Sequence, residues 1–287
     1  MKKNKILKIF AAVIAFALIG VVLFFINAFC GNPVSYLLAK YSAGQYIEDN
    51  FPESDYEIEN VSYFFKESQY SAKVKSQSSI DSHFSIKIDF FGNITYVSYE
   101  DNVLNKGNTK ERISREYFDK VVAVLEADIF PYETDYGYGM IRYSDEEECD
   151  SMGKGVFFVE ELELDMSYDI REIGKNTGKV DLCVREDVTV ENAAIILKKT
   201  KQLLNSADVY FYSIDFTLME KRTDDNKIPE KSIHINNFLA SYIDEDNLEE
   251  KIEIAIKETE EYYNEMYNDK QQEIDAYNKE MATATEE

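Results

Sequence analysis

The sequence is poor in the residues that most often carry catalysis or bind metal. Its 287 residues include two histidines, three cysteines and no tryptophan. Neither a His-Glu-x-x-His motif nor a pair of Cys-x-x-Cys motifs is present, so the common zinc signatures are excluded. The Gly-x-Ser-x-Gly motif of serine hydrolases is absent as well. No sequence motif therefore indicates an enzymatic reaction, and we expect no catalytic residue, cofactor or metal site.

The cysteines are too few to form a disulfide framework. Cys30 follows an apolar run, and only Cys149 and Cys183 lie well beyond it. A single bridge between these two remains open in an oxidising compartment, but the sequence does not determine its geometry. Cys183 lies in an apolar strand pattern, so we expect it to be buried.

Basic residues are also scarce. The chain has 31 Lys and Arg against 55 Asp and Glu, a net charge of −24. This balance excludes a broad basic surface for nucleic acid, and it argues against a protein that lies flat on anionic lipid. A solvated acidic surface that resists aggregation is the simplest explanation. The apolar content of 45% is enough to fill a core.

One long apolar run lies near the N-terminus. It has no charged side chain from Ile9 to Ile26 and continues to Phe29. About 20 apolar residues cross a bilayer as a helix, so residues 9–29 predict a membrane span. No acidic residue precedes the run, but four lysines do: Lys2, Lys3, Lys5 and Lys8. By the positive-inside rule, we predict a single-pass cell-membrane protein with a cytoplasmic N-terminus and an extracytoplasmic bulk.

Two other interpretations of this run remain open. A cleaved signal peptide has a shorter apolar region and a small-x-small cleavage site, whereas the triplet here is Ile26-Asn27-Ala28. A lipoprotein attached through Cys30 requires a small residue before the cysteine, and Phe29 is large. An uncleaved anchor therefore fits best.

The residues after the anchor predict an α+β fold. Residues 35–50 have helical spacing, with Ser35 as the expected N-cap and Phe51-Pro52 as the stop. Four segments with strand periodicity follow, at 56–66, 70–75, 84–90 and 94–99. Because their connections are short, we predict a four-stranded antiparallel meander covered by one helix. A second helix is expected at 109–126, capped by Asn108.

The remaining residues predict a second unit. Residues 128–156 contain proline, glycines and an acidic run, and we interpret them as an irregular connector that has room for one short strand. Strands are expected at 157–172 and 179–186 with a Gly174–Gly178 connection, then a helix to Asn205 capped by Thr189, and strands at 209–219 and 232–238. An acidic helix at 246–277 either packs on this sheet or projects toward a partner. The predicted divisions are residues 1–30, 31–127, 128–156, 157–245 and 246–287.

A sparse series of residues resembles a known family. It consists of the segment GNPVS at 31–35, Tyr46, Asp81-Ser82-His83-Phe84, Gly92, Tyr96-Val97-Ser98-Tyr99, Asn108-Thr109 and Arg112. This order resembles the YfjL-like proteins of Gram-positive bacteria, which are small and membrane-anchored, and the match is best over residues 30–125. The family favours an acid where Val97 stands here. The resemblance implies no reaction and no catalytic residue.

Four residues are candidates for a ligand site: Asp81, His83, Asn108 and Arg112. Asp81 and His83 share a face if the strand extends that far, and a carboxylate can orient an imidazole. Asn108 and Arg112 lie at a helix start, where a small anion can bind, although a structural role for both is simpler. His234 alternates with isoleucines and is expected to face outward.

We therefore predict a non-enzymatic module of the cell envelope. An envelope protein or peptide is its expected partner, and an unpaired strand edge is a natural docking place. The alternatives are an extracytoplasmic hydrolase that uses Asp81 and His83, and a lipoprotein of the same fold.

Overall fold

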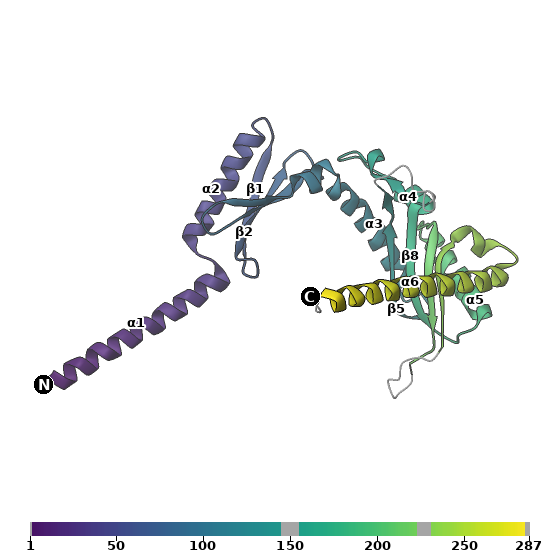
Figure 1. Ribbon diagram of the computed structural model, residues 1–287. Helices are drawn as coiled ribbons and strands as arrows, with labels where there is room; N and C mark the ends of the chain where they lie inside the picture. The colour runs from purple at the N-terminus through teal and green to yellow at the C-terminus, as the bar shows by residue number, and fades with distance from the viewer. Residues whose placement is uncertain (1, 145–154, 223–230, 285–287) are drawn as a thin grey trace. The chain divides into compact units, whose positions relative to one another are not determined.

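The computed structural model describes residues 2–144, 155–222 and 231–284 (Figure 1). Helices and mainly antiparallel strands form two compact units, which confirms the α+β class. The first unit comprises Met1–Lys110 and Leu162–Met166, and the second comprises Glu111–Glu161 and Ser167–Glu287. The division lies within a helix, at Lys110, rather than in the 128–156 segment.

The apolar run forms a helix of its own, α1 (Lys2–Cys30). Nearly all of the side chains of this helix that the structure describes face outward, and Phe16 is 75% exposed. Among the described residues, one helix is long and apolar enough to cross a membrane; it is this N-terminal one, and none of its most apolar window is buried.

The first unit places one helix on a four-stranded meander. Its further elements are α2 (Pro33–Asn50), β1 (Tyr56–Phe64), β2 (Gln69–Ser76), β3 (His83–Ile88), β4 (Ile94–Val97) and a π-helical turn η1 (Glu100–Leu104). The strand order is β1-β2-β3-β4, and every pair is antiparallel, as predicted.

Small residues allow α2 to approach the sheet closely. Ser35, Ala39, Ala43 and Ile47 are buried at intervals of four, which places them on one face of the helix. They pack against large strand side chains that include Tyr70, Phe84, Ile86 and Ile88. One helix face and one sheet face thus form the core of this unit.

The predicted cap of α2 is wrong. The N-cap is Asn32, whose side chain accepts a hydrogen bond from the Ser35 N–H, and Pro33 follows in the first turn. The Ser35 hydroxyl instead donates to the Phe90 carbonyl at 2.8 Å. Ser35 therefore fastens the helix to the β3–β4 hairpin.

The second unit contains a mixed sheet with the order β10-β9-β8-β5. Its elements are α3 (Gly107–Leu125, which begins in the first unit), β5 (Glu133–Ile141), β6 (Tyr143–Ser144), β7 (Phe157–Phe158), a 3₁₀ turn η2 (Val159–Glu161), α4 (Ile170–Thr177), β8 (Gly178–Arg185), α5 (Val190–Ser206), β9 (Ser213–Met219), β10 (Ser232–Leu239), a 3₁₀ turn η3 (Ala240–Asp244) and α6 (Leu248–Ala284). Strands β8 and β9 are parallel, and α5 supplies the crossover that such a pair requires. Thr189 caps α5 as predicted.

Strand β5 lies inside the segment that we interpreted as an irregular connector. Its glycines do not mark a loop. A Cβ at Gly137 would lie 2.8 Å from a methyl group of Leu125, and one at Gly139 would lie 2.5 Å from a methyl group of Val121. The glycines therefore make room for α3, which lies across this face of the sheet.

The secondary structure predicted for the segment before β8 is also wrong. Residues 157–172 were expected to form a strand, but only Phe157–Phe158 is one. Gly174 and Gly178 were expected in a connection; Gly174 lies in α4, and Gly178 begins β8. The Tyr117 ring packs against both glycines, and its hydroxyl donates to the Tyr210 carbonyl at 2.9 Å.

The C-terminal helix packs through its first half. Leu248, Ile252, Ala255 and Thr259 are buried, and α6 contacts β10 and α5. The Thr259 hydroxyl accepts a hydrogen bond from the backbone of Asn236 in β10. The described side chains after Thr259 are exposed, so the second half leaves the sheet.

Candidate functional site

Asp81 is a buried acid whose hydrogen bonds join separate segments of the first unit. Its side chain is 1% exposed. One carboxylate oxygen, Oδ2, accepts from the Thr109 hydroxyl and from the Asp165 N–H, both at 2.9 Å. The Asp81 N–H donates to the Asp165 carboxylate at 3.0 Å. Asp81 thus joins the β2–β3 loop to α3 and to Leu162–Met166, which explains why this distant segment belongs to the first unit.

Asn108 supports the same junction. It lies inside the first turn of α3 and is 4% exposed, so the prediction that it caps the helix is wrong. Its side-chain amide donates to the carbonyls of Asp81 and His83, both at 2.7 Å. We call Asp81, Asn108, Thr109 and Asp165 the Asp81 clasp.

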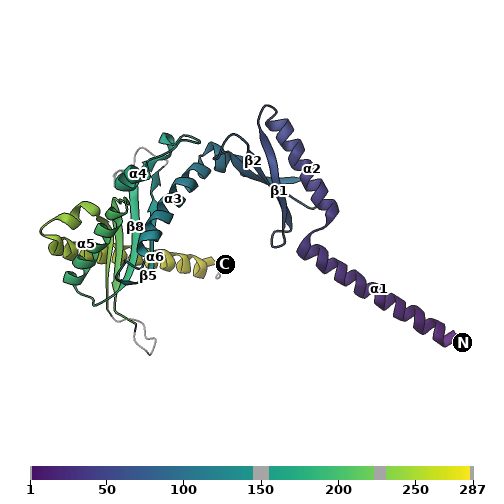
Figure 2. The same ribbon diagram turned by 180° about the vertical axis from the view of Figure 1, so that it is seen from behind.

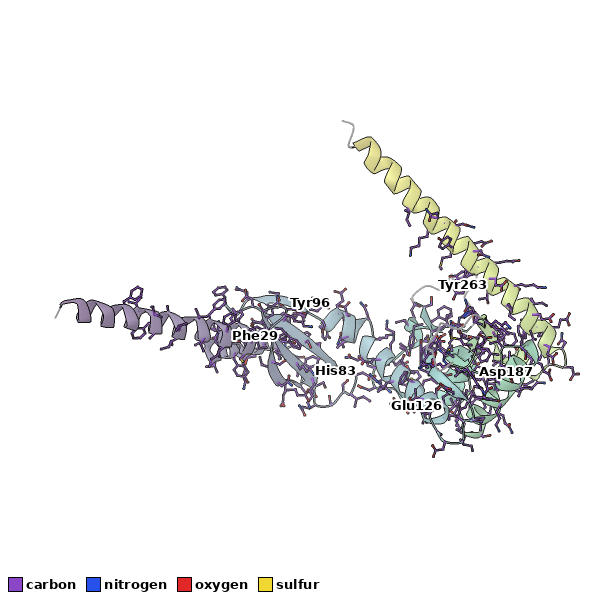
Figure 3. The ribbon with its side chains drawn as sticks, turned by 90° about the horizontal axis from the view of Figure 1, so that it is seen from below. Phe29, His83, Tyr96, Glu126, Asp187 and Tyr263 are labelled. Carbon is purple, nitrogen blue, oxygen red and sulfur yellow. The ribbon has the colours of Figure 1, made fainter. Side chains whose placement is uncertain are left out.

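His83 lies on a different side of the strand. Strand β3 begins at His83 and does not include Asp81. The imidazole is exposed on the sheet face opposite α2, while Asp81 is buried in the clasp. Figure 3 labels His83 well away from Phe29, at the other end of the first sheet.

Arg112 lies in the part of α3 that belongs to the second unit. It is half-buried there. Burial raises the pKa of the nearby Tyr143, and the positive charge of Arg112 opposes this shift. Of the four predicted residues, Asp81 and Asn108 share the clasp, while His83 lies on the open face of the first sheet, so Asp81 and His83 do not form the predicted pair.

His83 lines a shallow groove of about 580 Å³ on the open face of the first sheet. The polar side chains that line it are Glu59, Lys73, Lys75, Ser76, Gln77, Ser78, Ser79, Ser85 and Asn102. Strand pairing sets His83 opposite Lys75 and Ser85 opposite Lys73. We call this the Lys73 groove.

Two lysines, one carboxylate and His83 are the ionisable side chains that line the Lys73 groove. Lys75 Nζ lies 2.9 Å from a carboxylate oxygen of Glu59. The hydrogen bond from Lys75 lowers the pKa of Glu59, and the charges of Lys73 and His83 add to the effect. A second carboxylate, Glu57, lies opposite Lys75 in the strand pairing and accepts from the Gln77 side chain at 3.0 Å. Two lysines and His83 therefore lie beside two carboxylates, in a chain whose net charge is −24.

A signal for these lysines was present in the sequence. Lys73 and Lys75 alternate with the buried Ala72 and Val74, and this alternation places both lysines on the open face. Reasoning by residue type selected His83 and missed the lysines. The groove is recognisable only when neighbouring strands are placed side by side.

The second sheet carries charged side chains of both signs on the face that bears Lys179. Lys179 Nζ lies 2.6 Å from an Asp215 carboxylate oxygen. The Tyr138 hydroxyl donates to Asp181 at 3.1 Å. Burial raises the pKa of Asp181, and the charge of Asp215 adds to this shift. His234 is exposed on this sheet, as expected, and its ring contacts Thr217.

Two of the cysteines and the groups of side chains that could ligate a metal were also considered in the sequence analysis. Cys149 lies outside the described residues, so its bridge to Cys183 stays a prediction. Cys183 is 1% exposed, which confirms the expected burial, and burial raises the pKa of its thiol. Within the described ranges, no group of three His, Cys, Asp or Glu side chains is arranged to hold a metal ion.

Comparisons with known proteins identify the family. A model of the YfjL-like N-terminal domain matches residues 6–101, and a model of the YfjL-like C-terminal domain matches residues 116–253. No curated protein and no solved structure matches the chain. The two domain models together cover most of the sequence and confirm the resemblance. The chain therefore belongs to the YfjL-like family.

Proposed function

We propose that this protein is a single-pass protein of the cell membrane whose two units lie outside the cytoplasm. The exposed apolar side chains of α1 support a membrane span, because none of the helix's most apolar window is buried by the part of the chain that the structure describes. The four lysines before the span support a cytoplasmic N-terminus. A cleaved signal peptide and a lipoprotein attached through Cys30 are the alternatives, and the intact mass of the membrane form distinguishes all three.

Within this arrangement, the protein acts as a non-enzymatic binding module of the envelope. The Lys73 groove is the binding site, and its partner is an acidic segment of an envelope protein or peptide. The observation that carries this proposal is the gathering of Lys73, Lys75 and His83 on one face of the first sheet, in a chain with a net charge of −24. Such local charge attracts an anionic partner and orients it during encounter.

The hydrogen bonds that Asp81 makes in the Asp81 clasp favour a binding module over a hydrolase that uses Asp81 and His83. A hydrolase that uses Asp81 and His83 requires the carboxylate to orient the imidazole. The Oδ2 atom of Asp81 instead accepts from Thr109 and Asp165, and the His83 ring lies on the open face.

Site-specific crosslinking on intact cells tests the proposal. A photo-reactive amino acid at Ser85, on the groove wall, should capture a defined envelope protein. The variant Lys73→Glu should abolish this capture, because it places a negative charge where the acidic segment binds. Lys198→Glu is the matched control. It reverses the charge at an exposed position on α5, in the second unit, and should leave the yield of captured protein unchanged.

Three results would overturn the proposal. Capture of the same protein with equal yield in wild type and Lys73→Glu would show that the Lys73 groove does not bind this partner. Equal losses in Lys73→Glu and Lys198→Glu point to a general charge effect. Recovery of lipid alone leaves the module without a protein partner.

A further inference from the structure

The passage from α1 into the first unit is rigid. Only Gly31 and Asn32 separate α1 from α2. The Tyr63 hydroxyl donates to the Ala28 carbonyl at 3.0 Å. The Tyr70 hydroxyl accepts from the Asn32 N–H at 2.8 Å and donates to the Asn32 carbonyl at 3.0 Å. Two tyrosines of the sheet thus hold both sides of this connection.

Gly31 allows these tyrosines to lie so close to the backbone. Its φ of +71° is a conformation that favours glycine. A Cβ at this position would lie 2.5 Å from the Tyr70 hydroxyl oxygen. The connection is therefore a clamped junction rather than a flexible linker, and it fixes which end of the unit faces the membrane.

Exposed aromatic side chains gather at that end. In a meander, the β1–β2 and β3–β4 turns lie at the same edge. Phe64 ends β1, and Phe65 and Phe91 lie in the two turns; the exposed fractions of the three side chains are 52%, 50% and 82%. The Phe65 ring lies 5.9 Å from the ring of Phe29, at the end of α1. Figures 1 and 2 show the β1–β2 turn beside the end of α1 from both sides.

Helix α2 adds an outward apolar stripe next to these turns. Val34, Leu37 and Tyr41 are 67%, 64% and 66% exposed. Their spacing of three and four residues places them on one helix face, opposite the buried stripe of Ala39 and Ala43. The Ser42 hydroxyl bonds the Gly92 carbonyl at 2.7 Å, so this half of α2 lies along the β3–β4 turn.

We propose that this end of the first unit rests in the bilayer. The aromatic base, which we define as Val34, Leu37, Phe64, Phe65 and Phe91, occupies the boundary between the headgroups and the acyl chains. Aromatic rings are enriched at this depth, and burial of apolar surface there is favourable. The inference rests on the proposed membrane span.

The lipid bilayer is the occupant that the geometry favours over a protein. The base is continuous with the membrane helix through the Phe29–Phe65 contact and the Tyr63–Ala28 hydrogen bond. A helix that crosses the bilayer and is clamped at its end must bring these turns to the membrane surface. Because the contact is apolar, it requires no anionic lipid and agrees with the acidic net charge.

Tryptophan fluorescence tests the inference directly, because the chain contains no tryptophan of its own. Three single variants of the full chain are placed in nanodiscs of zwitterionic lipid brominated at shallow or deep acyl positions. Phe91→Trp reports on the aromatic base. Val21→Trp, exposed in the middle of α1, reports on the span. Ile80→Trp, 65% exposed in the β2–β3 loop at the opposite end of the first sheet, is the matched control.

The expected pattern differs at each position. Phe91→Trp should lose roughly half of its emission to shallow bromines and less to deep ones, because an interfacial ring lies ~5–10 Å into the boundary. Val21→Trp should be quenched most by deep bromines, and Ile80→Trp by neither. Raising the salt concentration should leave the quenching of Phe91→Trp unchanged.

Two failures are distinguishable. If Val21→Trp is quenched by deep bromines while Phe91→Trp is not, the span holds and the bilayer contact is overturned. A blue-shifted but unquenched emission from Phe91→Trp has the same meaning and points to cover by protein. If neither position is quenched, the membrane span fails, and the inference fails with it.

Discussion

The two sheets solve the same packing problem in opposite ways. In the first unit, the helix supplies the small residues: Ala39 and Ala43 of α2 meet large side chains of the strands. In the second unit, the sheet supplies them: Gly137 and Gly139 of β5 leave room for the large side chains of α3. Close approach of a helix to a sheet thus needs small residues on one side, and either side suffices.

The open faces differ as well. The first sheet presents Lys73, Lys75 and His83 around a shallow groove. The second presents Asp181 and Asp215, each already bonded to a neighbouring side chain. The first sheet therefore gathers two lysines and His83 beside a groove, whereas the charged side chains of the second sheet form ion pairs, Lys179 with Asp215 and Arg185 with Asp135.

The largest expected effect follows from the role of Tyr117 in the second unit. This ring is 0% exposed and fills the space above Gly139, Gly174 and Gly178. Tyr117→Ala should destabilise the second unit by about 3–5 kcal/mol, since the glycines cannot fill the cavity. Hydrogen exchange followed peptide by peptide should show faster exchange in β5 and β8 and no change in β2 and β3.

Tyr117→Phe is the matched control, because it keeps the ring and removes only the hydroxyl. It should cost about 0.5–1.5 kcal/mol, the usual value for one hydrogen bond. Equal costs for the two variants would show that the hydrogen bond to Tyr210, rather than the packing of the ring, stabilises this unit.

A double-mutant cycle tests whether the glycines of β5 exist to admit α3. Leu125→Ala alone should cost about 2–5 kcal/mol, because Leu125 is 3% exposed. Gly137→Ala alone should cost about 1–3 kcal/mol, because its Cβ would lie 2.8 Å from a methyl group of Leu125. In the double variant this clash is absent, and urea unfolding should give a cost well below the sum. Strict additivity would contradict the packing role of Gly137.

These glycines also show where prediction from sequence fails. The alternation from Phe84 to Ile88 and the stripe of α5 depend on neighbours in sequence, and both were predicted correctly. Strand β5 was missed because glycine is typical of loops, whereas here its role depends on Tyr117 and Val121 of another element. Composition alone does not distinguish a turn glycine from one that admits a helix.

The candidate site shows the same limit. Asp81 and Asn108 were selected by residue type, but their structural role depends on Asp165, 84 residues from Asp81. No local pattern contains that contact. The lysines of the groove were accessible to alternation within β2, yet their neighbours Glu59 and His83 come from two other strands.

The smallest expected effects come from changing one acid in each unit, Asp55 in the first and Asp181 in the second. The hydroxyls of Ser76 and Ser78 hold the pKa of Asp55, on the first unit, at about 2. Its stabilisation is present above the unfolded pKa of about 3.9 and is lost as the pH falls toward 2. Asp55→Asn should therefore lower stability at neutral pH, and the difference from wild type should shrink as the pH falls through that window.

Asp181 of the second sheet should behave with the opposite sign. Burial and the charge of Asp215 raise its pKa, so the ionised carboxylate destabilises the folded state at neutral pH. Asp181→Asn should raise stability by less than ~1 kcal/mol, because the carboxyl is half-buried and solvent screens its charge. This gain should shrink as the pH falls through the raised pKa of the folded carboxyl, and it should be gone below the unfolded pKa of about 3.9. Urea unfolding at several pH values measures both variants, and a loss of stability in Asp181→Asn at neutral pH would show that the hydrogen bond from Tyr138 outweighs the burial of charge.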